Sequence, residues 1–572
     1  MTHQDKISLI WPVAELLRGD YRPSDYGKVI LPFVVLRRLD CVLEPTKEAV
    51  IARLLTLPEK ADDSMKEAML NKAAGGLRFH NISPFTFRKM KNDPDNIAAN
   101  LRSYIAGFSE SVREIFLDKY DFDKEIARLE KSRLLYQVFC KFCEIDLHPD
   151  REDSHQMGYL FEELIRRFSE MSNETAGEHF TPREVIKLMV NILFYEDDDA
   201  LNEKGIIRTL LDPTAGTGGM LSVASETLFE MNPDATLEAF GQELNPESYA
   251  ICKSDMLIKG QDISQIAFGN SLTQDGFSNK HFDYFLSNPP FGVEWKKIEK
   301  EIRGEFETKG VKGRFGAGLP RISDGSFLFL QHMVSKFKPT GSRLAIVFNG
   351  SPLFSGGAGS GESEIRRWLI EGDMLEAIIA LPDQLFYNTG ISTYVWVVTN
   401  RKSESRKGKV QLVNAVGFFE KMRKSLGNKR NVITDDQIDD IVRIYGENQP
   451  GQHCKVFDNK DFGYNQVTVE RPLVENGKVI KGRDGKPKAD ASLRDTENVP
   501  LKENIKDYFL RDVKPHVPDF WIDESKTRIG YEIPFTRLFY EYQPPRDLAE
   551  INTEIQSLED EIQEMLREIA AC

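Results

Sequence analysis

The tetrapeptide Asn288-Pro-Pro-Phe291 combines residue types that suit chemistry on a planar amine. Its two prolines fix the backbone, so that the Asn288 side chain and the Pro289 carbonyl point the same way. Both groups accept hydrogen bonds, and together they suit an –NH₂ group with two hydrogens to donate. Phe291 offers a face on which a base could stack, an interaction worth roughly 1–3 kcal/mol. We therefore predict a catalytic motif formed by Asn288, Pro289, Pro290 and Phe291.

A glycine-rich turn and an acidic residue precede this motif. The run Asp212-Pro-Thr-Ala-Gly-Thr-Gly-Gly219 follows an apolar strand and begins a helix, which lets a ligand approach the backbone closely. By itself it is a dinucleotide-binding turn or only a tight turn, and it lacks the Gly-Lys-Ser/Thr of a phosphate-binding P-loop. Glu243 ends the next strand, where a carboxylate can accept hydrogen bonds from both ribose hydroxyls of a nucleoside or simply cap a helix. The pair favours a nucleoside without separating NAD from S-adenosylmethionine, whereas Asn288–Phe291 favours the latter.

Alternating strands and helices position these residues. Helical spacing predominates over residues 1–150, and the pattern changes at about residue 205. We expect strands at 206–212, 239–243, 282–287, 343–348, 374–381 and 394–399, and helices at 246–259, 326–338 and 363–371. Strands separated by helices predict a mostly parallel sheet in an α/β layer.

The alternation of strands and helices ends after about residue 425. Residues 474–492 have the composition of an exposed polar hairpin or loop. The last 25 residues predict a helix with a heptad seam, which packs either on its own domain or on another subunit. The seam is formed by Leu548, Ile551, Ile555, Leu558, Ile562, Met565 and Ile569. We predict four domains: 1–150, 151–425, 426–545 and 546–572.

The overall composition limits the partners and the location. No stretch approaches the roughly 20 apolar residues of a membrane helix, and the first residues lack the plan of a signal peptide, so we expect a cytoplasmic protein. The net charge of −15 argues against unaided DNA binding, because phosphate contacts need basic side chains. Cys140 and Cys143 with His148 suggest a zinc site, but buried reduced thiols on a helix are favoured because no second ligand pair is present. We predict no metal.

The ordered trio of glycine turn, acid and Asn-Pro-Pro-Phe resembles the motifs of amino-methyltransferases that act on adenine N6. More specifically, the chain resembles the modification subunit of type I restriction–modification systems nearly from end to end. The resemblance is carried by segments 17–26, 177–185, 462–464, 469–472 and 530–537. It implies a Rossmann-like α/β methyltransferase core dependent on S-adenosylmethionine, after an all-helical N-terminal domain and before a C-terminal extension ending in a long helix. It also implies double-stranded DNA as substrate and a separate specificity subunit, commonly with two modification subunits. A restriction subunit can join them.

The resemblance assigns further site residues. Phe180–Pro182 would lie against the methionine end of the cofactor, and Thr181–Glu184 also has the form of a capping box. Phe386, rather than Tyr387, would pack on a flipped base, although ordinary core packing explains Phe386 equally well. The expected cofactor-binding residues are Glu178, His179, Phe180, Thr181, Pro182, Arg183, Asp212, Thr214, Ala215, Gly216, Gly218, Glu243 and Asn270.

Two glycine-rich segments have the composition of loops, and three other functions compete with DNA methylation. The basic segment 309–321 is either a mobile loop that closes over DNA or a solvated loop without a special role, and we expect 355–361 to be mobile. Methylation of glutamine side chains or RNA adenines is the nearest rival chemistry. A scaffold with a lapsed cofactor site and a dinucleotide oxidoreductase are the others, but intact motifs argue against the first and Asn288–Phe291 against the second.

Overall fold

The computed structural model divides the chain into two compact units, Met1–Ile533 and Pro534–Cys572. The residues that it describes are 11–58, 60–152, 156–157, 160–161, 163–164, 167–168, 181–197, 202–258, 261–387, 389–426, 428–475, 478–482, 485–540 and 547–571.

The N-terminal region is helical, as the residue spacing predicts. Between residues 11 and 152 the described residues form no strand, and Phe33 at the centre contacts the rings of Phe122, Phe139 and Phe142. The main α-helices are α2 (Tyr26–Leu43), α3 (Lys47–Leu55), α4 (Asp63–Ala73), α5 (Phe87–Lys91), α6 (Ile97–Ala106), α7 (Glu110–Glu114), α8 (Phe122–Lys131) and α9 (Leu135–Glu144).

A nine-stranded sheet forms the centre of the first unit, in the order β11-β8-β6-β7-β5-β4-β1-β2-β3. The strands are β1 (Ile207–Asp212), β2 (Thr236–Glu243), β3 (Ile266–Phe268), β4 (Tyr284–Ser287), β5 (Arg343–Asn349), β6 (Leu375–Ala380), β7 (Thr393–Thr399), β8 (Lys409–Asn414) and β11 (Cys454–Asp458). All six strands expected from the sequence are present. The sheet is mixed, since β7 runs antiparallel to both β5 and β6, and β11 runs antiparallel to β8.

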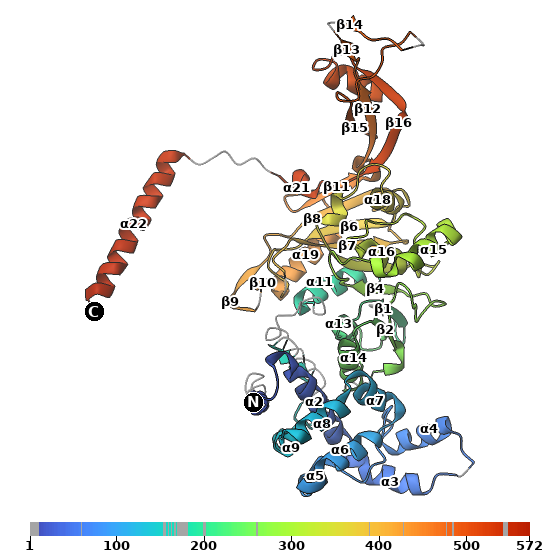
Figure 1. Cartoon of the computed structure of the whole chain (residues 1–572), viewed down its shortest axis with the longest axis vertical. Coiled ribbons are helices and arrows are strands. Elements are labelled where there is room, and N and C mark those ends of the chain that lie inside the picture. Colours follow the sequence, from blue (N-terminus) through green and yellow to red (C-terminus); the bar gives the residue numbers. More distant parts are fainter. Residues whose placement is uncertain are drawn as a thin grey trace. The chain divides into compact units, whose positions relative to one another are not determined.

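Helices cover both faces of this sheet (Figure 1). On one face α11 (Arg183–Phe194) packs against α13 (Gly219–Met231) and α19 (Asp435–Glu447). On the other face α16 (Ser326–Val334) places Phe327 against Phe348 of β5 and Trp396 of β7. Side chains alternate between the faces along β5, since Ala345 and Val347 belong to the core cluster that includes the α11 residues. Burial on both faces explains why these strands read as continuous apolar runs.

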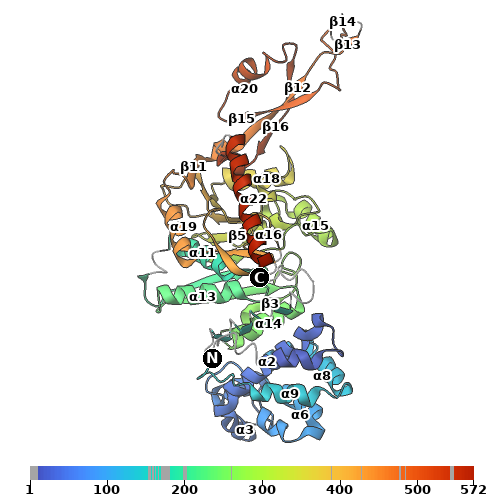
Figure 2. The same ribbon diagram turned by 90° about the vertical axis from the view of Figure 1, so that its left-hand side faces the viewer.

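Helix α14 (Pro246–Ile258) lies between the sheet and the N-terminal helices (Figure 2). Its Lys253 forms an ion pair with Glu114 at the end of α7, 3.1 Å apart. The strand order reverses between β1 and β4, because the chain passes from β1 to β2 and β3 on one side and from β4 to β5 on the other. The carboxyl ends of strands at such a reversal are where open α/β sheets bind ligands.

The sheet continues beyond residue 425, the boundary expected from the sequence, because β11 adds its edge strand. The interruption in the pattern comes from β9 (Glu420–Leu426), β10 (Lys429–Val432) and α19, which intervene between β8 and β11. A second, three-stranded sheet follows, formed by β12 (Gly463–Glu470), β15 (Asp495–Pro500) and β16 (Trp521–Tyr531). The expected exposed hairpin is present as β13 (Val474–Glu475) and β14 (Lys478–Val479). The division into four domains stays a prediction.

The second unit contains α21 (Phe535–Leu538) and the expected terminal helix, α22 (Leu548–Ala571). Most of the apolar seam of α22 is exposed to solvent, as the half-exposed Ile555, Leu558, Ile562 and Met565 show. The packing partner of this seam, the helix's own domain or another subunit, stays a prediction.

Candidate active site

The glycine-rich turn after β1 has the backbone that its glycines predict. Gly216 and Gly218 have φ angles of +54° and +84°, and a Cβ on Gly218 would lie 2.8 Å from the Cys252 sulfur. Asp212 holds the turn from within: its Oδ1 accepts the Thr214 N–H at 3.0 Å. Burial, together with the smaller effect of the neighbouring Glu243 carboxylate, raises the pKa of the Asp212 carboxyl to about 7. Asp212 thus braces the turn and does not line the pocket beside it.

Glu243 occupies the expected place at the end of β2. Its Oε2 accepts the Gly216 N–H at 2.8 Å and its Oε1 accepts the Asn245 N–H at 2.7 Å. The carboxylate therefore joins the glycine turn to the loop that begins α14. Each of its oxygens retains a further lone pair, so a ligand hydroxyl can still donate to it.

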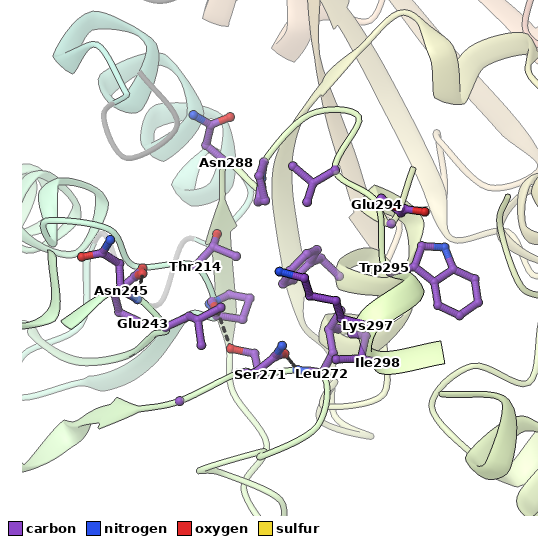
Figure 3. A pocket seen from close by; sticks show the side chains of 18 of the residues that line it. Thr214, Glu243, Asn245, Ser271, Leu272, Asn288, Glu294, Trp295, Lys297 and Ile298 are labelled. Atoms are coloured by element: carbon purple, nitrogen blue, oxygen red, sulfur yellow. Dashed lines mark hydrogen bonds between the residues drawn. The ribbon is translucent and has the colours of Figure 1, made fainter. Parts of the chain in front are cut away.

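A pocket of about 640 Å³ opens between this turn and the segment after the Asn-Pro-Pro-Phe motif (Figure 3). Five of the residues predicted from the sequence line it: Thr214, Glu243, Asn270, Asn288 and Pro290. Ala215 and Pro289, two other predicted residues, are buried and do not line the pocket.

The Asn270 segment forms one wall of the pocket through interactions that the sequence does not reveal. The Asn270 Oδ1 accepts the Leu272 N–H at 2.9 Å, and the Ser271 hydroxyl donates to the Pro213 carbonyl at 2.6 Å. Arg314 then donates to the carbonyls of Ser271 and Leu272, at 3.2 and 2.8 Å. The backbone of this wall is thus fixed from both sides.

The side-chain amide of Asn288 at the end of β4 is held on its donor side. Its Nδ2 donates to the Thr181 hydroxyl at 2.9 Å, a contact between residues 107 positions apart. Its Oδ1 is buried and, among the described residues, has no hydrogen-bond partner. A buried acceptor without a partner costs free energy unless a ligand satisfies it. A donor group bound beside β4 would do so.

The contact with Asn288 corrects the capping box predicted at Thr181–Glu184. Helix α11 begins at Arg183, its N-cap residue is Pro182, and no side chain caps it. Thr181 has turned to Asn288 instead, and Glu184 forms an ion pair with Lys429 of β10. The predicted cofactor residues Glu178, His179 and Phe180 lie outside the described residues.

Arg183 and the two aromatic candidates also have defined neighbours. Arg183 forms an ion pair with Glu226 of α13, 2.9 Å apart. Phe386 is 1% exposed and meets the ring of Phe291 edge-on, with centroids 6.4 Å apart. The structure thus brings the late aromatic to the Asn-Pro-Pro-Phe motif, while Phe386 also belongs to the apolar core.

Both glycine-rich segments are anchored, which differs from the expectation of open or mobile loops. In segment 309–321 Phe315 is fully buried and Arg314 pairs with Glu305 of α15 (Glu299–Lys309), 2.6 Å apart. In segment 355–361 the carbonyls of Ser355 and Gly356 accept hydrogen bonds from the buried Arg366. Long-range side-chain partners of this kind leave no signal in local composition.

Sequence reasoning missed most of the opposite wall of the pocket. That wall is formed mainly by Val293, Glu294, Trp295, Lys297, Ile298, Gly325 and Phe329. The stretch 293–298 follows Phe291 almost directly. This proximity to the catalytic motif is the one feature of the sequence that could have predicted its place in the pocket wall. Among the described residues, no group of three or more His, Cys, Asp or Glu side chains is placed to hold a metal ion, and no helix is long and apolar enough to cross a membrane.

Comparisons with family models and with known proteins agree on one family. The family model described as N-6 DNA Methylase matches residues 152–471, and that of the HsdM N-terminal domain matches residues 8–142. The type I restriction enzyme MjaIX methylase subunit of Methanocaldococcus jannaschii is 26% identical over 487 residues, which covers 82% of each chain. The MpnII methylase subunit of Mycoplasma pneumoniae is 23% identical over 472 residues, 76% of this chain and 82% of the relative.

A solved structure shares the fold. The type I restriction–modification system methyltransferase subunit from Streptococcus thermophilus superimposes with a TM-score of 0.64 at 24% sequence identity. The match covers 80% of this chain and 96% of that one.

Proposed function

This chain belongs to the N-6 DNA methylase family, and we propose that it transfers the methyl group of S-adenosylmethionine to N6 of adenine in DNA, as the modification subunit of a type I restriction–modification complex. The family model spans more than half of the chain, and the match to the HsdM N-terminal domain accounts for most of the helical region before it.

One observation carries the proposal: the buried Oδ1 of Asn288, which has no partner among the described residues and lies beside the pocket. Thr181 holds the amide so that the oxygen is the free end. An amino group of a base is the donor that this acceptor suits. An adenine in a duplex reaches such a site only when it is swung out of the stack, which costs a few kcal/mol.

The pocket residues fit the proposed cofactor. A volume of about 640 Å³ is within the usual range for sites that hold a ligand of nucleoside size. Glu243 supplies a carboxylate for ribose hydroxyls, while Asn270 and apolar residues such as Ile298 offer a wall for an adenine ring. When bound, S-adenosylmethionine supplies an activated methyl group on a sulfonium centre. We assign its binding to the residues predicted from the sequence, with Glu243 and Asn270 at the nucleoside end and Thr181 and Pro182 at the methionine end.

The chain's own residues would then act by placement and by preorganised acceptors. The adenine amino nitrogen is a poor nucleophile, because its lone pair is delocalised into the ring. Hydrogen bonds from its two N–H groups to Asn288 Oδ1 and the Pro289 carbonyl favour the pyramidal, more nucleophilic form. Phe291 and Phe386 are the aromatic pair available to the base.

Dependence on partner subunits is part of the same proposal. The chain has a net charge of −15, so a separate specificity subunit would supply much of the contact with double-stranded DNA. The exposed apolar seam of α22 is a surface on which such a subunit can pack. We propose two modification subunits for each specificity subunit, a complex that a restriction subunit can join, and a cytoplasmic location with the DNA.

Tritiated methyl transfer from S-adenosylmethionine to DNA tests the proposal, with the chain alone and with its co-purified partner. We expect label in N6-methyladenine, and only when the partner is present. A chain that leaves DNA unlabelled with its partner while it labels RNA or protein would refute the DNA assignment. Asn288→Ala serves as the matched inactive control.

A further inference from the structure

A basic β-ribbon projects from the sheet near the catalytic motif. Strands β9 and β10 form this antiparallel hairpin, which lies beside α11 in Figure 1. Residues 417–432 contain five basic residues and one acidic residue, in a chain whose net charge is −15. The basic residues are Lys421, Arg423, Lys424, Lys429 and Arg430.

Three of these side chains are exposed and free. Lys421, Arg423 and Arg430 are exposed, and none forms an ion pair or a side-chain hydrogen bond with another described residue. Lys421 and Arg423 are two positions apart on one strand, so they share one face of the ribbon. Other exposed basic residues of this chain pair with neighbouring carboxylates, as Arg443 does with Asp440. A row of unpaired ones suits an anionic partner.

The fourth described residue, Lys429, is turned inward and fixes the hairpin to the site. A β-bulge lies between Lys429 and Asn431, and such an irregularity re-aims side chains. Lys429 is buried, forms an ion pair with Glu184 and donates to the Leu385 carbonyl at 3.0 Å. Leu385 precedes Phe386, and Glu184 lies three residues after Thr181, the partner of Asn288.

Backbone hydrogen bonds complete this attachment. The N–H groups of Arg430 and Asn431 donate to the Gln384 carbonyl, and that of Asn428 donates to the Tyr387 carbonyl. Gln384 has a φ angle of +58°, a conformation that a non-glycine residue rarely adopts. The ribbon and the segment around Phe386 therefore form one connected structure, so that a ligand of the ribbon is held at a fixed place relative to the catalytic motif.

We propose that the β9–β10 hairpin binds the phosphate backbone of DNA next to the target base, through Lys421, Arg423 and Arg430. This inference rests on the proposed function, because it takes DNA as the substrate. Contacts with phosphate position a duplex without reading its sequence. The hairpin would therefore raise the affinity for all duplexes alike and leave sequence discrimination to another part of the complex.

The test is the salt dependence of DNA binding by the complex of the chain with its co-purified partner. The triple variant Lys421→Ala/Arg423→Ala/Arg430→Ala is compared with Lys478→Ala/Lys481→Ala/Lys488→Ala, which removes the same charge from exposed positions in and after the β13–β14 hairpin. The probe is a fluorescent 40-base-pair duplex of random sequence, titrated at several salt concentrations. Retained co-purification and S-adenosylmethionine binding check that each variant folds.

We expect the first variant to lower the slope of log affinity against log salt by about 0.9 for each phosphate that the hairpin no longer neutralises. Raising the salt from 50 to 200 mM weakens DNA binding by both proteins. If all three side chains bind phosphate, the fold-loss of affinity is about 40 times smaller for this variant than for the wild type. We expect the KM for DNA to rise while kcat at saturating DNA stays the same, and the control variant to keep the wild-type slope.

Three results would overturn the inference: an unchanged slope, an equal change in the control, or loss of the partner subunit from the variant. The last would make the hairpin a subunit contact. These results are separate from failure of the proposed function, which is read from the wild-type complex alone. A wild type that methylates adenine in DNA while the triple variant keeps its slope refutes only the hairpin proposal.

Discussion

The buried carboxyl of Asp212 makes the stability of the catalytic unit depend on pH, and Asp212→Asn should remove that dependence. Burial raises the pKa of Asp212 from 3.8 to about 7. Because the folded-state pKa is raised, the protonated carboxyl favours folding. Its contribution is complete below about pH 3.8 and is lost as the pH rises through about 7. The amide introduced by Asp212→Asn would keep an acceptor for the Thr214 N–H without ever carrying a charge.

The size of the effect follows from the two pKa values. Integrated between pH 5 and pH 8, the shift removes about 2–3 kcal/mol of stability from the wild type and none from Asp212→Asn. The variant's advantage in melting temperature should therefore grow by about 2–3 °C from pH 5 to pH 8, for a compact unit that spans Met1–Ile533. The measurement is thermal unfolding followed by tryptophan fluorescence at matched ionic strength, with circular dichroism as the check on folding. If the difference between the two melting temperatures stays constant over this pH range, Asp212 does not titrate there.

Three further variants test separate parts of the site. Asn288→Ala should leave binding of S-adenosylmethionine nearly intact and reduce kcat about 10²–10³-fold, as loss of one preorganised hydrogen-bonding group does; equal loss of binding and turnover would contradict its role. Gly218→Ala should destabilise the catalytic unit by about 1–2 kcal/mol, because the residue has a φ angle of +84° and its new Cβ would meet Cys252; urea denaturation measures this, and an unchanged midpoint would refute it. Arg314→Met should weaken S-adenosylmethionine binding in calorimetry with little change in kcat, because the wall at Ser271 and Leu272 loses its donor; a selective fall in kcat would place Arg314 nearer the chemistry.

The central part of the fold follows from local patterns. Apolar strands separated by helices are specified by short-range periodicity, so β1, β2 and β4 are found where the sequence predicts them. Their carboxyl ends share one edge of the sheet, which is why Thr214, Glu243 and Asn288 all line one pocket. The order of the strands, and the antiparallel direction of β7, depend on packing between distant segments and are not written in any window of the sequence.

Interactions between distant residues account for what the sequence could not show. A threonine followed by Pro-Arg-Glu has the local form of a capping box, but Thr181 contacts Asn288, 107 positions away. A basic, glycine-rich stretch has the composition of an open loop, yet the ion pair of Arg314 and the buried ring of Phe315 anchor it. In each case a tertiary interaction overrides the local preference, and the residues concerned lie at or beside the pocket.

The amide of Asn288 also has a consequence for which bases the site can accept. With its nitrogen engaged by the Thr181 hydroxyl, the amide presents its oxygen to a bound base. In a base with a keto group at the corresponding edge, such as guanine or thymine, the lone pairs of the keto oxygen would repel those of Asn288 Oδ1. Sites built to bind an N–H group reject analogues that lack it by roughly 10⁴–10⁵. The observed orientation of one side-chain amide thereby disfavours keto bases, independently of the DNA sequence that surrounds the target.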